Sequence, residues 1–142
     1  MWQRIQTLYL ALATGLIVAL YWCNLSSVVM DDGTLQYIAY TDKTVFTIWI
    51  SLLTIFHVLA LGGYKWRMKQ FRVVIFTAIV CAAFQIWLVL YYFQTKGVEV
   101  ISWTALFPLA AVILDVLAAR NILLDEAIVF SANRLRSPRK KR

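Results

Sequence analysis

Four stretches of about 20 residues that are nearly free of charge dominate the sequence, namely residues 5–23, 45–64, 73–93 and 101–119. This is the length that an α-helix needs to cross about 30 Å of hydrocarbon. Within these runs, Asp115 is the only residue that carries a formal charge. Lipid offers no hydrogen-bonding partner to a bare amide, so each run must satisfy its own backbone, which favours helix over strand. We therefore expect an all-α integral membrane protein, a bundle of four transmembrane helices.

The composition supports this interpretation. Of the 142 residues, 62% are hydrophobic and 15% are charged, against roughly a quarter charged in a soluble protein. Two cysteines are too few for a disulfide scaffold or a thiolate metal cluster. A cleaved signal peptide is the alternative for the first run, but Tyr21 and Trp22 stand where a signal peptidase requires small residues. We expect the first helix to be retained.

Basic residues predict the orientation, because cytoplasmic loops are rich in Lys and Arg. Twelve of the 14 Lys and Arg residues fall before the first run, between the second and third, or after the fourth. This distribution predicts that the N-terminus and the C-terminus are cytoplasmic, and that residues 24–44 and 94–100 lie outside. The twelve are Arg4, Lys65, Arg67, Lys69, Arg72, Arg120, Arg134, Arg136, Arg139, Lys140, Lys141 and Arg142, whereas Lys43 and Lys96 lie on the other side.

The first outer segment is long enough to hold structure of its own. Asp32 and Gly33 stand between two β-favouring runs, a pattern typical of a tight hairpin turn in which both central residues take positive φ. We expect a small extracytoplasmic β-hairpin, which residues 97–101 could extend by a short third strand. A loop on the headgroups, anchored by Tyr37 and Tyr40, is the alternative.

The segment between the second and third runs is predicted to be a short basic turn, with Trp66 and Phe71 among its cations. Such a segment lies at anionic lipid headgroups. We interpret it as a determinant of topology, and a lipid-headgroup site is the sharper alternative. Its cations are Lys65, Arg67, Lys69 and Arg72.

After the fourth run, residues 120–136 have a roughly helical apolar spacing. They either continue the fourth helix or lie along the membrane as an amphipathic cytoplasmic helix. Pro138 marks a break, and residues 137–142 are expected to form a disordered basic tail. We thus expect one domain over residues 1–136, with anionic lipid rather than nucleic acid as the partner of its basic groups.

Ionisable groups within membrane spans are costly and are candidates for function. Asp115 lies five residues before Arg120, about 7 Å inside the predicted cytoplasmic end. Arg4 enters the first helix at the same level. We hypothesise an ion pair between Arg4 and Asp115 that joins the first and fourth helices, and a proton-carrying Asp115 is the alternative.

Two other patterns concern packing. His57 and Gln85 lie near mid-membrane and could meet, each among small or polar residues that recur at helical spacing. Ala11, Gly15 and Ala19 form a small-residue stripe on the first helix, which allows close helix packing against the fourth helix, another copy or another protein. A disulfide between the two cysteines is not expected, because their depths differ.

The sequence contains no phosphate-binding glycine loop, nucleophile elbow or Cys-x-x-Cys pair. A lone histidine is a poor metal or haem site. We expect no catalytic residues, cofactor or metal, and therefore no enzyme. The leading interpretation is a structural or accessory subunit that assembles with itself or with a larger membrane complex, and a small oligomeric transporter or channel is the alternative.

Two segments resemble a known family. The first is the opening, residues 1–10, Met-Trp-Gln-Arg-Ile-Gln-Thr-Leu-Tyr-Leu, and the second is the set of residues after the last span. Together they resemble a family of small four-helix inner-membrane proteins of Bacteroidetes that is known as a domain of unknown function. The resemblance implies the bacterial inner membrane as the compartment and implies no reaction. The second set is Arg120, Ile122, Asp125, Glu126, Val129, Ser131, Arg134, Leu135 and Arg136.

Overall fold

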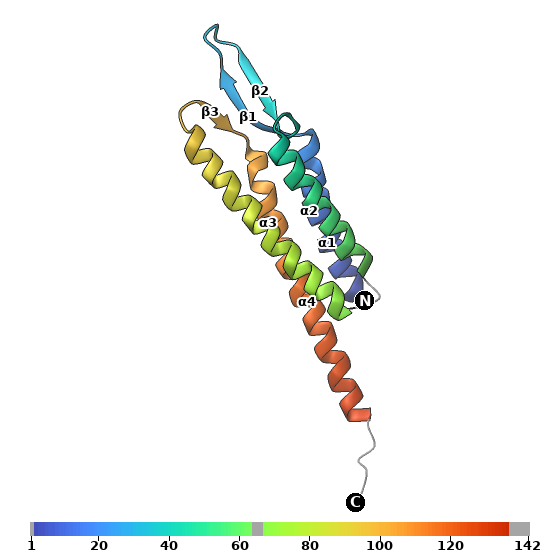
Figure 1. Ribbon diagram of the computed structural model, residues 1–142. Helices are drawn as coiled ribbons and strands as arrows, with labels where there is room; N and C mark the ends of the chain where they lie inside the picture. Colours follow the sequence, from blue (N-terminus) through green and yellow to red (C-terminus); the bar gives the residue numbers. More distant parts are fainter. Residues whose placement is uncertain (1, 64–66, 137–142) are drawn as a thin grey trace, which may run out of the picture.

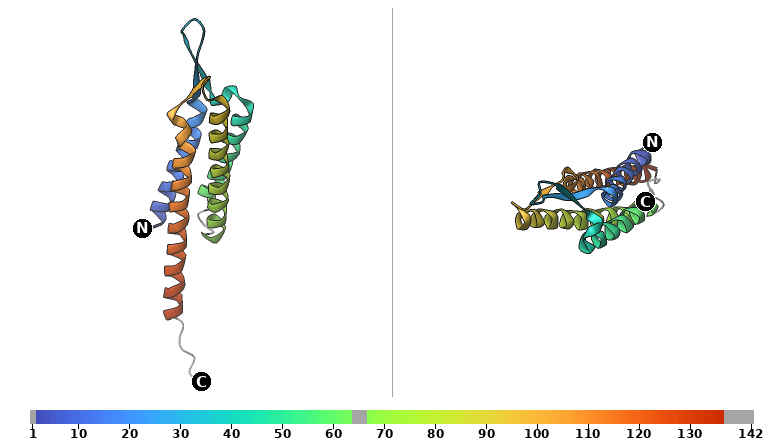
Figure 2. Two further views of the ribbon diagram at one scale, coloured as in Figure 1. Left: turned by 90° about the vertical axis from the view of Figure 1, so that its left-hand side faces the viewer. Right: turned by 90° about the horizontal axis from the view of Figure 1, so that it is seen from above.

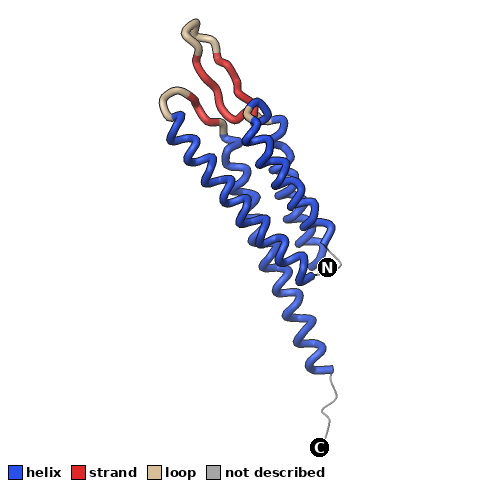
Figure 3. Tube along the Cα trace, in the orientation of Figure 1, coloured by secondary structure: helices blue, strands red, loops and turns tan. Residues whose placement is uncertain are grey.

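The four apolar runs form four α-helices in the computed structural model, which describes residues 2–63 and 67–136 and, within them, all side chains except those of residues 2–4, 67 and 133–136. The helices are α1 (Trp2–Ala19), α2 (Thr44–Gly62), α3 (Arg67–Thr95) and α4 (Phe107–Arg136). Each contains a segment long and apolar enough to cross a membrane. Figures 1 and 3 show an elongated bundle with a small β-sheet at one end. We call this the sheet end, and the opposite end, beyond which α4 continues, the tail end.

The helix bounds differ from the predicted ones in several places. Helix α3 begins at Arg67, so most of the predicted basic turn is helical. The fourth span was predicted to begin at Ile101, but Ile101 ends a strand and α4 begins at Phe107. Pro108 then falls in the first turn of α4, where its missing N–H has no helical partner to lose. Residues 120–136 continue α4 without a break, which decides between the two predicted arrangements.

The helices pack as a ring in which each one contacts two neighbours. Helix α1 packs against α4 and α2, and α3 packs against the same two helices. Helices α2 and α4 therefore occupy opposite corners of the bundle, and the left view of Figure 2 shows α1 beside α4 and α2 beside α3. Both run from the sheet end to the tail end, so residues at one depth on α2 face residues at the same depth on α4.

The predicted hairpin and third strand are both present. The strands β1 (Asn24–Val29), β2 (Leu35–Ala39) and β3 (Glu99–Ile101) form an antiparallel sheet in the order β2-β1-β3. The turn differs from the prediction, because only Gly33 has positive φ, at 79°. The Gly33 N–H donates to Met30 O and the Met30 N–H to Thr34 O, each at 2.9 Å. These bonds define a three-residue loop that closes on a left-handed glycine.

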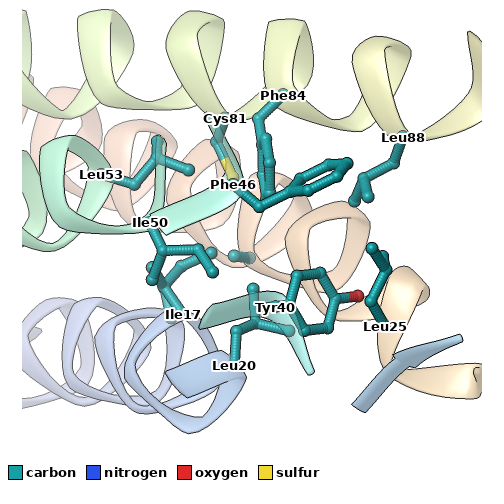
Figure 4. Close-up of a cluster of buried hydrophobic side chains, with 12 residues drawn as sticks. Ile17, Leu20, Leu25, Tyr40, Phe46, Ile50, Leu53, Cys81, Phe84 and Leu88 are labelled. Carbon is teal, nitrogen blue, oxygen red and sulfur yellow. The ribbon is translucent and has the colours of Figure 1, made fainter. Parts of the chain in front are cut away.

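Two clusters of buried apolar side chains fill the bundle. The larger lies toward the sheet end, where Phe46 of α2 packs edge-on against Phe84 of α3 with ring centroids 6.2 Å apart (Figure 4). The smaller lies toward the tail end and includes Leu10 of α1, Val74 of α3 and Ile122 of α4. These two clusters, which we call the sheet-end core and the tail-end core, enclose the site described next.

Candidate functional site between the two apolar cores

The site consists of one histidine and one aspartate at the centre of the bundle. His57 Nε2 lies 3.3 Å from Asp115 Oδ2, and both side chains are fully buried. His57 comes from α2 and Asp115 from α4, so the pair spans the diagonal of the ring. The atoms are at ion-pair distance without the alignment of a hydrogen bond, and Nε2 and both carboxyl oxygens have no hydrogen-bond partner among the described residues.

The other ring nitrogen of His57 is fixed by the backbone. Nδ1 lies 2.8 Å from the carbonyl oxygen of Leu53, one turn earlier on α2. A carbonyl can only accept a hydrogen bond, so Nδ1 carries a proton and Nε2 is the nitrogen turned toward Asp115. The geometry thereby assigns a distinct role to each ring nitrogen.

Apolar layers enclose the pair on both sides. One turn toward the sheet end lie Leu53 of α2 and Ala111 of α4, which belong to the sheet-end core. One turn toward the tail end lie Ala60 of α2 and Ala118 of α4, which belong to the tail-end core. His57 and Asp115 thus lie in a layer between the two apolar cores. Charge in such a layer is expensive unless it is paired.

The predicted partner of Asp115 was Arg4, whose side chain lies outside the described residues, so that ion pair remains a prediction. His57 was predicted to meet Gln85, but His57 faces Asp115 instead. Gln85 Oε1 is buried with no hydrogen-bond partner in the part of the chain that the structure describes. The sequence did hold a signal for the observed pair, because the second and fourth predicted spans, residues 45–64 and 101–119, run in the same direction and His57 and Asp115 lie 12 and 14 residues after their respective starts.

The small-residue stripe of α1 does not pack within the chain as a helix interface. Ala11 and Gly15 are exposed and Ala19 is half-buried. A methyl group added at Gly15 would meet nothing within 4 Å. The buried face of α1 instead carries Leu10, Ala13 and Ile17. The stripe therefore lies on the side of α1 that faces away from the bundle. Of the three predicted partners, another copy and another protein remain.

Of the predicted basic group, Lys65 and the side chain of Arg67 lie outside the described residues. Lys69 and Arg72 are exposed on the first two turns of α3, at the tail end. Between them, Gln70 is buried and donates from Nε2 to the carbonyl oxygen of Ala60 at 3.1 Å. The exposed cations thus lie next to a buried contact between α3 and α2, and the topology determinant and the lipid-headgroup site both stay predictions.

A second polar cluster, which the sequence analysis did not find, joins the sheet to the bundle. The Glu99 carboxylate on β3 accepts hydrogen bonds from Ser26 of β1 and Tyr91 of α3, each at 2.6 Å. Lys43, just before α2, lies 3.5 Å from Glu99 and also donates to the Tyr91 hydroxyl. We call these four residues the Glu99 cluster. Its members lie up to 73 positions apart in the sequence, and local sequence patterns do not predict that they come together.

Charges in the Glu99 cluster stabilise one another. Burial raises the pKa of Glu99, but hydrogen bonds from Ser26 and Tyr91 and the charge of Lys43 outweigh it, so the pKa is lowered overall. Burial lowers the pKa of Lys43, yet the contacts with Tyr91 and Glu99 dominate and raise it. Nearby, burial raises the pKa of Tyr40 to about 12. The cluster therefore combines an ion pair with hydrogen bonds that hold β1, β3 and α3 together around neutral pH.

The ionisable groups at these sites can exchange protons and form ion pairs. No group of three or more His, Cys, Asp or Glu side chains that could hold a metal occurs among the described residues. Cys81 is buried and its thiol donates to the carbonyl oxygen of Pro108 at 3.3 Å. Among the described residues, His57 and Asp115 are the fully buried side chains that lie at ion-pair distance.

These features define a mostly helical protein with four helices long and apolar enough to cross a membrane and a three-stranded sheet at one end. Its family is shown by a model that matches residues 2–135: the chain belongs to the family described as a domain of unknown function, DUF4293. No curated protein and no solved structure matches the chain.

Proposed function

We propose that the protein is a multi-pass protein of the bacterial inner membrane that acts as a non-enzymatic accessory subunit, assembling with itself or with a larger membrane complex. In this proposal both termini are cytoplasmic, the sheet is extracytoplasmic, and the assembly surface is the part of α4 that extends beyond the bundle. The excess of basic residues at the tail end supports the orientation.

The observation that carries the proposal is the apolar character of this α4 extension, residues 123–136. Ile122 is 1% exposed and is the last buried residue of α4 among the described side chains. Beyond it, Ile128 is 58% exposed and Phe130 is 69% exposed. Figure 1 shows α4 continuing well past the ends of the other three helices. Large apolar side chains in such a position indicate an interaction surface.

The length of α4 supports a position of the extension outside the hydrocarbon. Because His57 and Asp115 meet, Gly62 and Arg120 lie at about the same level, each five residues further toward the tail end. From Arg120 to Arg136 the helix advances about 24 Å at 1.5 Å per residue. A membrane about 30 Å thick that covers the bundle would therefore leave the extension in the cytoplasm.

The extension has one apolar and one polar side. At about 100° per residue, Ala127 lies in the middle of an arc that includes Leu123, Leu124 and Ile128. Val129 lies about 160° away from Ala127, on the side that also carries Asp125 and Glu126. An apolar arc on a straight helix in water is the surface that a helix partner would cover.

Crosslinking in native membranes tests this proposal. Cys23 and Cys81 are replaced by Ser, and a single cysteine is introduced as Ala127→Cys or, as the matched control, Val129→Cys. We expect oxidation to crosslink the first variant to a second copy or to one recurrent protein, identified by mass spectrometry, and the second variant much less. A monomer at both positions with no recurrent product would overturn the proposal.

A small transporter or channel is the second candidate, and the His57–Asp115 pair is the observation that favours it. Ionisable residues within spans often mark proton or ion pathways. Proton flux into proteoliposomes that is present in the wild type and lost in Asp115→Asn and His57→Ala would support this candidate. Flux that both substitutions leave unchanged would remove its basis.

A further inference from the structure

Hydrogen bonding at the central pair constrains how many protons it can hold. His57 Nδ1 already has a proton, because it faces the Leu53 carbonyl oxygen. Between Nε2 and Asp115 Oδ2, 3.3 Å apart, there is room for one more. Without it a nitrogen lone pair faces a carboxylate, and with two protons an N–H faces an O–H.

The net charge of the layer follows from this count. With one shared proton the pair is either imidazolium with carboxylate or imidazole with carboxylic acid, and both forms have zero net charge. Any other count leaves a net charge of one unit inside the bundle, where desolvation costs several kcal/mol for an unpaired ion. Neutrality of the layer thus selects the singly protonated pair.

The surroundings give the pair little compensation from other charges. On α3, Cys81 is the titratable group that interacts electrostatically with Asp115, and its thiol donates a hydrogen bond to the carbonyl oxygen of Pro108. The described side chains of α1, from Ile5 to Ala19, carry no formal charge, and Arg4 precedes them outside the described side chains. Arg120 on α4 is exposed. The charge balance within the described layer thus rests on His57 and Asp115.

We propose that His57 and Asp115 form a proton-binding site in which one shared proton holds α2 and α4 together across the centre of the bundle. Helices α2 and α4 are not neighbours in the ring, and this is the ionisable contact recorded between their described side chains. Apolar cores on both sides separate the site from either end, so gain or loss of the proton is coupled to loosening of the bundle. The inference holds whether or not the protein assembles with others.

The proton count can be measured directly, because the chain contains a single histidine. Protein labelled with ¹⁵N-histidine in lipid nanodiscs gives an NMR spectrum of His57 alone, which reports whether Nδ1 and Nε2 carry protons. The infrared difference spectrum between the wild type and Asp115→Asn reports whether the Asp115 carboxyl is ionised. Together the two measurements count the protons on the pair.

At pH 7 we expect a protonated Nδ1 and one further proton, found either on Nε2 with an ionised carboxylate or on the carboxyl with a bare Nε2. A bare Nε2 together with an ionised carboxylate would overturn the proposal. A protonated Nε2 together with a carboxylic acid, or a bare Nδ1, would overturn it as well.

A second measurement tests the link between α2 and α4 without relying on one variant. We expect His57→Leu and Asp115→Leu each to lower the thermal midpoint in nanodiscs at pH 7, and the double variant to recover at least half of the larger loss, since an apolar pair leaves no orphaned charge. We also expect acidification to pH 4 to lower the thermal midpoint of the wild type more than that of the double variant. The double variant keeps Glu99, so it controls for the acid sensitivity of the Glu99 cluster. Additive losses, or the same acid sensitivity in both proteins, would contradict the proposed role.

Discussion

Glu99 connects the sheet to the bundle, and its replacement by glutamine should weaken that connection measurably. The Glu99 side chain is 11% exposed and accepts two hydrogen bonds of 2.6 Å on one oxygen, from Ser26 and Tyr91. Hydrogen bonds to a charged group contribute about 1.5–3 kcal/mol each, and neutral ones about 1 kcal/mol. Glutamine keeps a neutral acceptor for these hydrogen bonds but loses the ion pair with Lys43. The Lys43 side chain is one-third exposed, so the loss of that ion pair destabilises the fold by at most about 1 kcal/mol.

These contributions sum to a destabilisation of about 2 kcal/mol for Glu99→Gln at pH 7. Glu99→Ala should cost about 3 kcal/mol, because it leaves the fully buried Ser26 hydroxyl without its acceptor. Chemical or thermal unfolding in mild detergent measures both. Asp31→Asn, on the exposed hairpin turn, removes the same charge and should change stability by no more than about 0.5 kcal/mol.

The pH dependence checks the physical reason. The pKa of Glu99 is lower in the folded protein than in the unfolded chain. Its stabilising contribution is therefore fully present above the unfolded value, about pH 4.3, and is lost as the pH falls through the folded value. The difference in stability between the wild type and Glu99→Gln should be constant above about pH 6 and shrink below about pH 4. Equal stability at pH 7, or a gap that persists at low pH, would refute the reasoning.

Three other predictions concern individual positions. If Arg4 pairs with Asp115 in place of the shared proton, Arg4→Gln and Asp115→Asn should each lower the thermal midpoint in detergent, and the double variant should recover part of the loss; strictly additive losses would show that the two residues do not interact. Phe84→Ala should cost about 3–5 kcal/mol by opening a cavity in the sheet-end core, whereas Phe93→Ala, at a side chain 65% exposed, should cost far less in the same unfolding assay. Gly33→Ala should destabilise the hairpin by about 1 kcal/mol, because φ is 79° there; hydrogen exchange of the β1 and β2 amides measures this, and unchanged protection would contradict it.

Local sequence features predicted most of the architecture. Four runs of about 20 apolar residues gave the number of helices, and Asp32-Gly33 indicated the hairpin between the first two. The prediction was wrong where tertiary pairing competes with helix formation. Ile101 is apolar enough to belong to a span, but it pairs with Ser26 of β1 and so belongs to the sheet. Boundaries of this kind depend on the neighbouring strand, which hydropathy does not contain.

The candidate site was predicted only in part. Asp115 and His57 were each singled out as costly within a span, but each was given another partner, Arg4 and Gln85 respectively. The pairing depends on which helices lie on a diagonal of the ring, and helix order along the chain does not determine that arrangement. The exposure of the small-residue stripe on α1 was not predicted for a similar reason. A pattern of small residues indicates a close contact but does not indicate which surface makes that contact.

The α4 extension and the sheet lie at opposite ends of the bundle, so the proposed topology can be tested by labelling both ends in intact cells. Asp31 in the hairpin turn and Ala132 on the α4 extension are both exposed, so Asp31→Cys and Ala132→Cys serve as probes, in the background lacking Cys23 and Cys81.

The most direct test of the account is the reaction of these two variants with an impermeant maleimide. We predict that Asp31→Cys reacts in intact cells, or in spheroplasts where an outer membrane blocks access, and that Ala132→Cys reacts only after the inner membrane is permeabilised. Labelling of Ala132→Cys but not of Asp31→Cys in cells with an intact inner membrane would show the reverse orientation. A protein that is recovered outside the membrane fraction, and in which neither cysteine is labelled even after permeabilisation, would contradict a membrane-spanning bundle.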